Sequence, residues 1–167
     1  NTMDKATMTD HTPVIRQSDD FGFAATDQYR QSVILIVDDD PANIQLICTA
    51  LSNERYDFGI SLGPEQALKF LEKKNVPDLI LLDVRMPKMD GFTLCRKIKS
   101  NPKWAQIPVI FLTALNDEDS VVKGFESGGV DLLPLPFRRR ELVARVHTHL
   151  ELKRARDSLR RQMEEIR

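Results

Sequence analysis

Acidic side chains follow two of the most apolar stretches of this 167-residue chain. Asp38, Asp39 and Asp40 come directly after the run VILIV, and Asp83 ends the run DLILLD. A third apolar run, IPVIFLTA, carries Thr113 near its end. If these runs are parallel strands of one sheet, their carboxyl ends share one edge, and the carboxylates and the hydroxyl converge there. Carboxylates this close repel one another and raise each other's pKa.

A divalent cation would relieve the repulsion in this predicted cluster. Mg²⁺ prefers oxygen ligands and keeps several waters, so two or three carboxylates suffice. Ca²⁺ fits less well because the sequence has no Asp-rich twelve-residue loop that ends in Glu. Helix capping is a simpler role for Asp40, which precedes Pro41, but it explains little for Asp83 at the end of an apolar run.

Motifs for other cofactors are missing from the sequence. It has no Gly-rich phosphate loop, no G-x-G-x-x-G and no C-x-x-C. His147 and His149 are two residues apart on a predicted helix and cannot converge on one ligand. Cys48 and Cys95 are expected to be buried free thiols, which fits a reducing cytoplasm. The sequence has no basic-then-apolar leader and no apolar run near the ~20 residues of a membrane span, so we expect a cytoplasmic protein without membrane contact.

The elements that must position these residues are read from the alternation of apolar and amphipathic segments. We expect strands at 33–37, 56–62, 78–83, 107–114 and 130–135. We expect helices from Pro41 onward and at 64–73, 91–100, 117–128 and 139–167. Strands that alternate with helices predict an α/β fold with a doubly wound, five-stranded parallel sheet, and the flavodoxin-like order 2-1-3-4-5 is the leading topology. This order puts the last strand at an edge, where Pro134 is tolerated.

Four segments together resemble the receiver domain of bacterial two-component response regulators. They are ILIVDDDPANIQLI, PDLILLDVRMPKMDGFTLCRKIK, IPVIFLTA and GGVDLLPLPF. They follow one another in the family's order and spacing over about residues 33–150, and LLDVRMPKMDG is highly specific. The resemblance implies that a sensor histidine kinase or a phosphotransfer protein is the partner, and that the domain assists its own phosphorylation.

The resemblance also implies a role for each matching residue. Asp83 would accept the phosphoryl group, and Thr113 would be the switch hydroxyl that moves toward it. Asp38, Asp39 and Asp83 would bind Mg²⁺ together with the backbone carbonyl of Arg85. The loop after Asp83 would be shaped by Pro87 and Gly91.

Two positions depart from the family pattern. The residue before Pro136 is normally a lysine that pairs with the phosphoryl group, and here it is Leu135. Leu132 stands where an aromatic residue is usual. The resemblance implies a cis Leu135–Pro136 peptide bond, and we expect Leu135 to form an apolar wall of the acidic crevice.

Three functional interpretations follow from these departures. In the first, the site still binds Mg²⁺ and accepts a phosphoryl group with an atypical switch, and Arg85 partly replaces the lysine. The alternative for Arg85 is an ordinary solvent-facing side chain. In the second, the domain is a phosphorylation-independent dimerisation or binding module. In the third, Asp38 and Asp40 form the D-x-D pair of an unrelated phosphohydrolase, which LLDVRMPKMDG argues against.

The two ends of the chain extend beyond this domain, which we assign to residues 32–150. Residues 1–31 are polar and predicted to be a flexible extension. Residues 151–167 continue the last helix, where a heptad of Leu152, Leu159 and Ile166, with Met163, predicts a coiled-coil homodimer. A solvated helix is the alternative, because two heptads are few. Residues 138–167 carry ten basic and five acidic side chains, but these are interleaved, so we expect no nucleic-acid binding. No output-domain motif follows, so the helix is either itself the output or a linker to a missing output domain.

Overall fold

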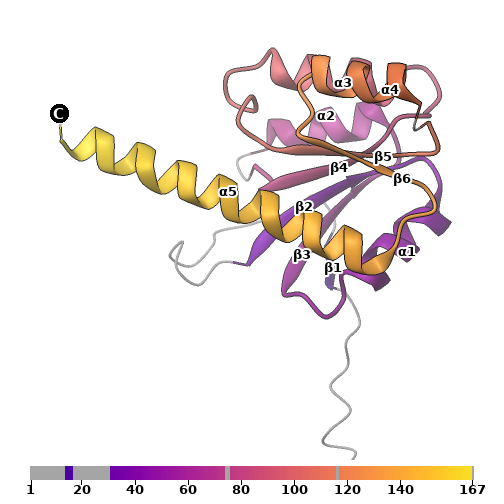
Figure 1. Ribbon diagram of the computed structural model, residues 1–167, viewed down its shortest axis with the longest axis horizontal. Coiled ribbons are helices and arrows are strands. Elements are labelled where there is room, and N and C mark those ends of the chain that lie inside the picture. Colours follow the sequence, from indigo (N-terminus) through magenta and orange to yellow (C-terminus); the bar gives the residue numbers. More distant parts are fainter. Residues whose placement is uncertain (1–13, 17–30, 74–75, 116, 167) are drawn as a thin grey trace, which may run out of the picture.

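A parallel β-sheet between two layers of helices forms the centre of the computed structural model, which describes residues 14–16, 31–73, 76–115 and 117–166 (Figure 1). The strands are β1 (Val14–Arg16), β2 (Ser32–Val37), β3 (Tyr56–Ser61), β4 (Leu79–Asp83), β5 (Val109–Thr113) and β6 (Asp131–Pro134). The helices are α1 (Pro41–Ala50), α2 (Pro64–Glu72), α3 (Gly91–Lys99), α4 (Glu118–Glu126) and α5 (Arg139–Glu165).

The order of the strands confirms the predicted topology. Within the described residues the sheet runs β1-β3-β2-β4-β5-β6, and every pair is parallel. Without β1, this is the order 2-1-3-4-5 of a flavodoxin-like sheet. The short strand β1 was not predicted, because residues 1–31 were assigned to a flexible extension. It pairs with β3 from Val14↔Asp57 to Arg16↔Gly59. Residues 1–13 and 17–30 of that extension lie outside the described part.

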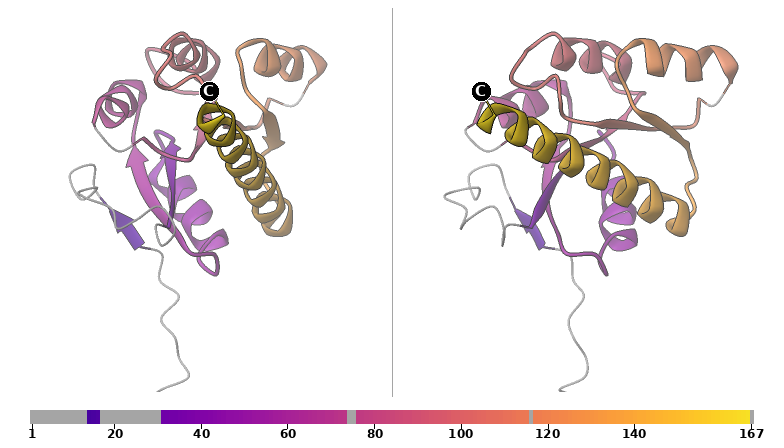
Figure 2. Two further views of the ribbon diagram at one scale, coloured as in Figure 1. Left: turned by 90° about the vertical axis from the view of Figure 1, so that its left-hand side faces the viewer. Right: turned by 60° about the vertical axis from the view of Figure 1, so that its left-hand side comes forward.

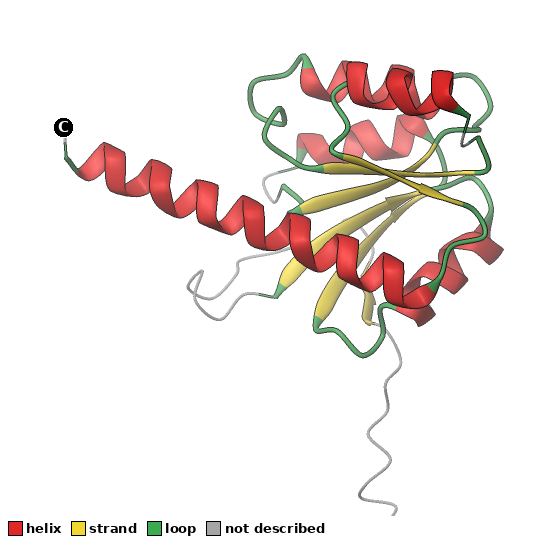
Figure 3. Cartoon of the chain, in the orientation of Figure 1, coloured by secondary structure: helices red, strands yellow, loops and turns green. Residues whose placement is uncertain are grey.

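Both faces of the sheet are covered, which explains the continuous apolar runs of its central strands. Helices α1 and α5 cover one face and contribute Ile44, Ile47, Leu142, Val146 and Leu150 to its apolar cluster. Helices α2 and α3 pack on the other face with Phe70, Phe92 and Ile98, and α4 lies on that side too (Figures 2 and 3). All residues of β2, β4 and β5 are buried.

Strand β6 forms one edge of the sheet, as predicted from its proline. Among the described strands it pairs only with β5, and Pro134 stands opposite Thr113 at the end of the pairing. Proline lacks a backbone N–H, so this position is acceptable on a strand whose outer side is not paired with another described strand. The chain then turns through Leu135, Pro136 and Phe137 into α5.

Helix α5 is much longer than the sheet requires. Its buried apolar residues end at Leu150, and the helix then projects past the amino ends of the strands (Figure 1). None of the described helices is both long and apolar enough to cross a membrane.

Candidate phosphoryl-acceptor and metal site

Three carboxylates meet where β2 and β4 end. Strands β2 and β4 pair in register as far as Val37↔Leu82. Asp38 directly follows Val37, and Asp83 directly follows Leu82. The two acids therefore lie side by side. Asp39 completes the group, and one ligand oxygen from each of the three lies within 4.8 Å of the others. The structure therefore brings together the three predicted carboxylate ligands of a metal ion.

Asp83 is the most strongly perturbed acid of this cluster. It is 9% exposed, and burial is the main reason why its pKa rises from 3.8 to about 6. The charges of Asp38 and Asp39 raise its pKa further, while the backbone N–H groups of Val84 and Arg85 donate to the carboxylate and lower it. A buried acid that is opposed by two like charges is the arrangement that a bound cation would stabilise.

Asp38 is held in place by the start of α1. Its backbone N–H donates to the carbonyl of Ser61, at 3.1 Å, and its Oδ1 accepts a hydrogen bond from the Asp40 N–H, at 2.9 Å. Burial raises the pKa of Asp38, and a hydrogen bond with the Asn43 side chain opposes that rise. Sequence reasoning missed Asn43. The only signal for it was its place in the first turn of a helix that starts just after the acids.

Asp40 has a different role from its neighbours. Its Oδ1 accepts from the N–H of Ala42, at 2.9 Å, and so caps the amino end of α1. This confirms the helix-capping interpretation of Asp40 and leaves Asp38, Asp39 and Asp83 as the candidate metal ligands.

Thr113 ends the neighbouring strand β5, one residue beyond the pair Asp83↔Leu112. The side chain is buried, and its Oγ1 accepts a hydrogen bond from the Leu115 N–H, at 3.0 Å. Because the hydroxyl oxygen accepts there, its own proton is left to donate to another group.

The loop after Asp83 is fixed by a close backbone contact. The Gly91 N–H donates to the carbonyl of Val84, at 2.8 Å. A Cβ on Gly91 would come within 2.9 Å of Val84 Cα and would overlap the Asp83 backbone, which explains why glycine occupies this position. The expected shaping role of Gly91 thus has a geometric cause. Pro87 lies on the exposed part of the same loop, where its carbonyl accepts from the Met89 N–H, at 2.8 Å.

A cleft of about 510 Å³ opens beside the loop after Asp83. Arg85 and Lys123 place two cations on its walls, and Phe92 and Leu115 supply apolar surface. The Lys123 ammonium group lies 5.4 Å from the centre of the Phe92 ring. Lys123 was not singled out from the sequence, since a lysine on an amphipathic helix carries no distinguishing signal.

Leu135 lies at the end of β6, beside Thr113. The Leu135–Pro136 peptide bond is cis, as predicted. The Leu135 side chain is half-buried and packs against the apolar cluster on the α1 and α5 face. Leu132 packs against the opposite cluster. Two apolar side chains thus stand where the family pattern has a lysine and an aromatic residue. That Leu135 also walls the acidic crevice stays a prediction.

The remaining candidate ligands do not assemble into a site. His149 Nε2 lies 3.0 Å from Asp131 Oδ2, and His147 is exposed. Cys48 and Cys95 are buried free thiols, as predicted. Within the described ranges, the Asp38, Asp39 and Asp83 cluster is the single group of three or more acidic, histidine or cysteine side chains with metal-binding spacing.

The fold and this acidic site together define a class of protein, and comparison with known proteins shows the same class. Residues 34–147 match the family model of the response regulator receiver domain. The chain therefore belongs to the receiver domain family, which displaces the phosphohydrolase interpretation.

Among curated relatives, the response regulator PleD of Caulobacter vibrioides is 42% identical over 127 residues, which are 76% of this chain and 28% of PleD. A probable cyclic di-GMP phosphodiesterase of Vibrio cholerae is 41% identical over 129 residues, which are 77% of this chain and 29% of that protein. The chain thus spans less than a third of either relative.

Solved structures give the same result. A putative response regulator from Chloroflexus aurantiacus is 35% identical, with a TM-score of 0.69 over 73% of this chain and 99% of that chain. The receiver domain of a signal transduction histidine kinase from Syntrophus aciditrophicus is 37% identical, with a TM-score of 0.66 over 72% of this chain and 90% of that one.

Proposed function

We propose that this receiver domain accepts a phosphoryl group on Asp83, with Mg²⁺, from a histidine kinase or a phosphotransfer protein. The observation that carries the proposal is the convergence of Asp38, Asp39 and Asp83 within 4.8 Å. Membership of the receiver family supports the class of partner. The buried free thiols Cys48 and Cys95 fit a reducing cytoplasm as the place of action.

The acidic cluster fits the ion that the family implies. All three side chains are oxygen donors, which Mg²⁺ prefers, and few protein ligands are needed because the ion keeps several waters. Burial first, and the neighbouring carboxylates second, raise the pKa of Asp83 and of Asp38, so a bound cation would favour their ionised forms. When bound, Mg²⁺ would neutralise charge on the transferring phosphoryl group. Asp38, Asp39 and Asp83 would hold it, and we keep the Arg85 carbonyl as a predicted fourth ligand.

Asp83, Thr113 and Arg85 would each have a distinct role in the transfer. The Asp83 carboxylate would attack phosphorus and form the acyl phosphate as the P–N bond to the donor's phosphohistidine breaks and its imidazole leaves, since a carboxylate can act as a covalent nucleophile. The Thr113 hydroxyl, whose oxygen already accepts from Leu115, would donate to a phosphoryl oxygen. Arg85 is exposed on the loop directly after Asp83. We propose that its guanidinium supplies part of the charge that a lysine at position 135 would have supplied.

A second function, phosphorylation-independent binding or dimerisation, is favoured by Leu135 and Leu132. Both are apolar and packed against the core clusters, so neither could act in the usual switch. In this alternative the acidic site is retained without being used.

The long helix is the proposed route of output. Leu152, Leu159 and Met163 are each about 60% exposed, and Ile166 is 85% exposed. We propose that this stripe pairs two copies as a coiled coil and leads to an output domain outside the present sequence. No role in binding nucleic acid is proposed for it.

Mass spectrometry of the intact protein tests the choice between the two functions. The wild-type chain is incubated with acetyl phosphate and Mg²⁺, and we expect one added phosphoryl group. Asp83→Asn should gain none. Asp40→Asn is the matched control, because Asp40 caps α1 and lies outside the cluster, and it should gain the group normally. A wild-type chain that gains no phosphoryl group while binding Mg²⁺ would support the alternative function.

A further inference from the structure

The helical extension contacts the body of the receiver beyond its last buried apolar residue, Leu150. Lys153 Nζ lies 3.9 Å from Asp78 Oδ1 at the start of β4. Arg154 donates to the Ser32 hydroxyl at the start of β2. Arg156 donates to the carbonyl of Gln106 in the segment before β5, at 3.0 Å. The amino ends of β2, β4 and β5, which are neighbours in the sheet, thus meet one short stretch of the helix.

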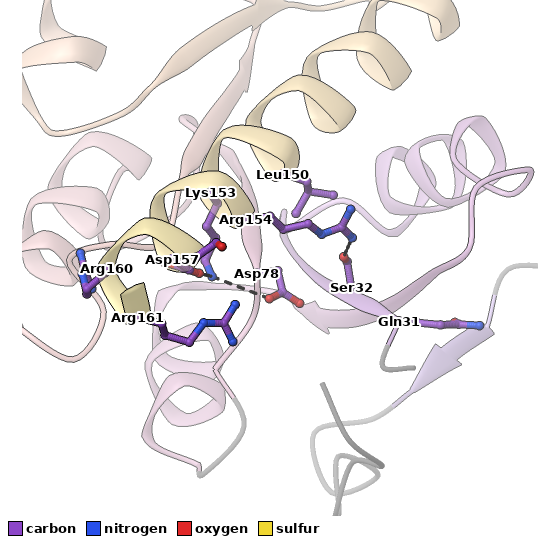
Figure 4. Close-up of a pocket in the computed structure, with 10 residues that line it drawn as sticks. Gln31, Ser32, Asp78, Leu150, Lys153, Arg154, Asp157, Arg160 and Arg161 are labelled. Atoms are coloured by element: carbon purple, nitrogen blue, oxygen red, sulfur yellow. Dashed lines mark hydrogen bonds and ion pairs between the residues drawn. The ribbon is translucent and has the colours of Figure 1, made fainter. Parts of the chain in front are cut away.

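The surface that receives the helix is itself well ordered. Asp78 Oδ2 accepts from the Val33 N–H, at 2.8 Å, and the Asp78 N–H donates to the Val33 carbonyl, at 2.8 Å. These bonds join the amino end of β2 to the residue just before β4. Figure 4 shows Lys153, Arg154 and Asp157 of α5 on the side that faces Ser32 and Asp78, around a groove of about 620 Å³.

The side chains of residues 153–157 differ in exposure, and Arg154 stays 58% exposed although it contacts Ser32. Lys153 is 18% and Asp157 34% exposed at the side chain, and the two form an ion pair of 2.8 Å. Leu152, one residue earlier, is 60% exposed and points elsewhere. The face of the extension that meets the receiver is therefore polar, and it differs from the apolar stripe of Leu152, Leu159 and Met163.

We infer that the amino ends of β2 and β4 form an intramolecular docking surface for residues 151–157. We call the contacts of Lys153, Arg154 and Arg156 the latch. The latch makes this stretch of the extension part of the rigid receiver, so that the helix leaves in one fixed direction. Leu150 is the last buried apolar residue of α5. Beyond it, polar contacts hold the helix against the receiver. The inference is independent of phosphorylation at Asp83.

Hydrogen exchange of the α5 amides, followed by NMR, tests the latch. Single exposed ion pairs contribute little, so the informative variant replaces all three cations: Lys153→Met, Arg154→Met and Arg156→Met. Methionine keeps the helix propensity and much of the alkyl chain. In the parent protein we expect protection to persist past Leu150 and through Asp157. In the triple variant the amides of 151–158 should exchange roughly 5–30-fold faster, and those of β2 and β4 should not change.

Both arms are measured in a Leu159→Lys background, because self-association along the apolar stripe would protect the same amides. Arg140→Met is the control, since it removes an exposed arginine from the first turn of the same helix, outside the groove. It should leave exchange at 151–157 unchanged. Protection that falls directly after Leu150 in the parent, or a triple variant that exchanges like the parent, would overturn the inference.

Discussion

The backbone N–H of Leu135 donates to the carbonyl of Thr113, at 2.9 Å. This bond ties the position that departs from the family pattern to the residue that carries the proposed switch hydroxyl. A long side chain at position 135 therefore starts from the strand beside Thr113, at the carboxyl edge of the sheet, where Asp83 also lies.

Leu135→Lys is expected to strengthen retention of a phosphoryl mimic. An ammonium group at this position would pair with the bound anion, a charge-assisted contact of ~1.5–3 kcal/mol, or roughly a tenfold or greater gain in affinity. Titration with beryllofluoride in the presence of Mg²⁺ measures it. Leu135→Met is the control, because it keeps an apolar side chain of similar volume. Equal affinities in all three proteins would show that position 135 does not face the site, and Arg85→Ala would then be the next variant.

Asp83→Asn is expected to stabilise the metal-free domain at neutral pH. The folded-state pKa of Asp83 is about 6, against 3.8 for an unperturbed aspartate, which corresponds to roughly 3 kcal/mol at pH 7. Because the folded pKa is the higher one, the stability linked to this group is fully present below pH 3.8 and is lost as pH rises through about 6.

Urea unfolding in EDTA at several pH values checks this sign. The free energy of unfolding of Asp83→Asn should exceed that of the wild type at pH 7, and the difference should shrink toward pH 4. Saturating Mg²⁺ should reduce the advantage at pH 7, since the cation stabilises only the ionised cluster. A variant that is less stable than the wild type at pH 7 without metal would contradict the argument.

Mg²⁺ binding is expected to depend on the cluster and not on acidity in general. Asp38→Asn, Asp39→Asn and Asp83→Asn should each weaken binding, because each removes one charged oxygen ligand. Asp40→Asn should bind as the wild type does, since an asparagine also caps a helix. Calorimetric titration gives the affinities. At a fixed Mg²⁺ concentration, the proteins that bind the ion more tightly should show the larger rise in melting temperature. If Asp40→Asn proves as damaging as Asp38→Asn, the assignment of roles within the three consecutive acids is wrong.

Dimerisation through α5 is expected to depend on its exposed apolar stripe. Leu159→Lys should convert a dimer to a monomer, as should a chain that ends at Glu151. Arg160→Met, next to Leu159 on the helix, should leave the dimer intact because it adds no charge to the stripe. Light scattering at several concentrations distinguishes these outcomes. A wild-type monomer throughout would favour the solvated-helix alternative, consistent with the shortness of two heptads.

Much of the fold could be predicted because local patterns and tertiary burial agree. The runs 33–37 and 78–83 are apolar on both faces, and the structure buries them on both faces. The acids that follow them could be placed at one edge because parallel strands fix where carboxyl ends meet. The proline at position 134 correctly marked an edge strand.

Other features depend on contacts that sequence patterns do not encode. Strand β1 has only three residues, too few for a detectable alternation of apolar and polar side chains. Its partner is β3, which lies about forty residues later in the sequence. The contact between Asp38 and Asn43 requires the turn between β2 and α1 to be known. The latch residues looked like an ordinary solvated helix face, because interleaved charges occur both on free helices and on helices that meet polar strand ends.

The two borders of the sheet bear on how copies of this domain behave at high concentration. One border is β1, of three residues, and the other is β6, of four residues and ending in Pro134. Long, flat edge strands are templates for the open-ended stacking of one molecule on the next, whereas short strands and prolines interrupt the ladder of backbone donors and acceptors. The sheet therefore offers a poor surface for edge-to-edge aggregation. The exposed apolar stripe of α5 is thus not accompanied by an aggregation-prone sheet edge.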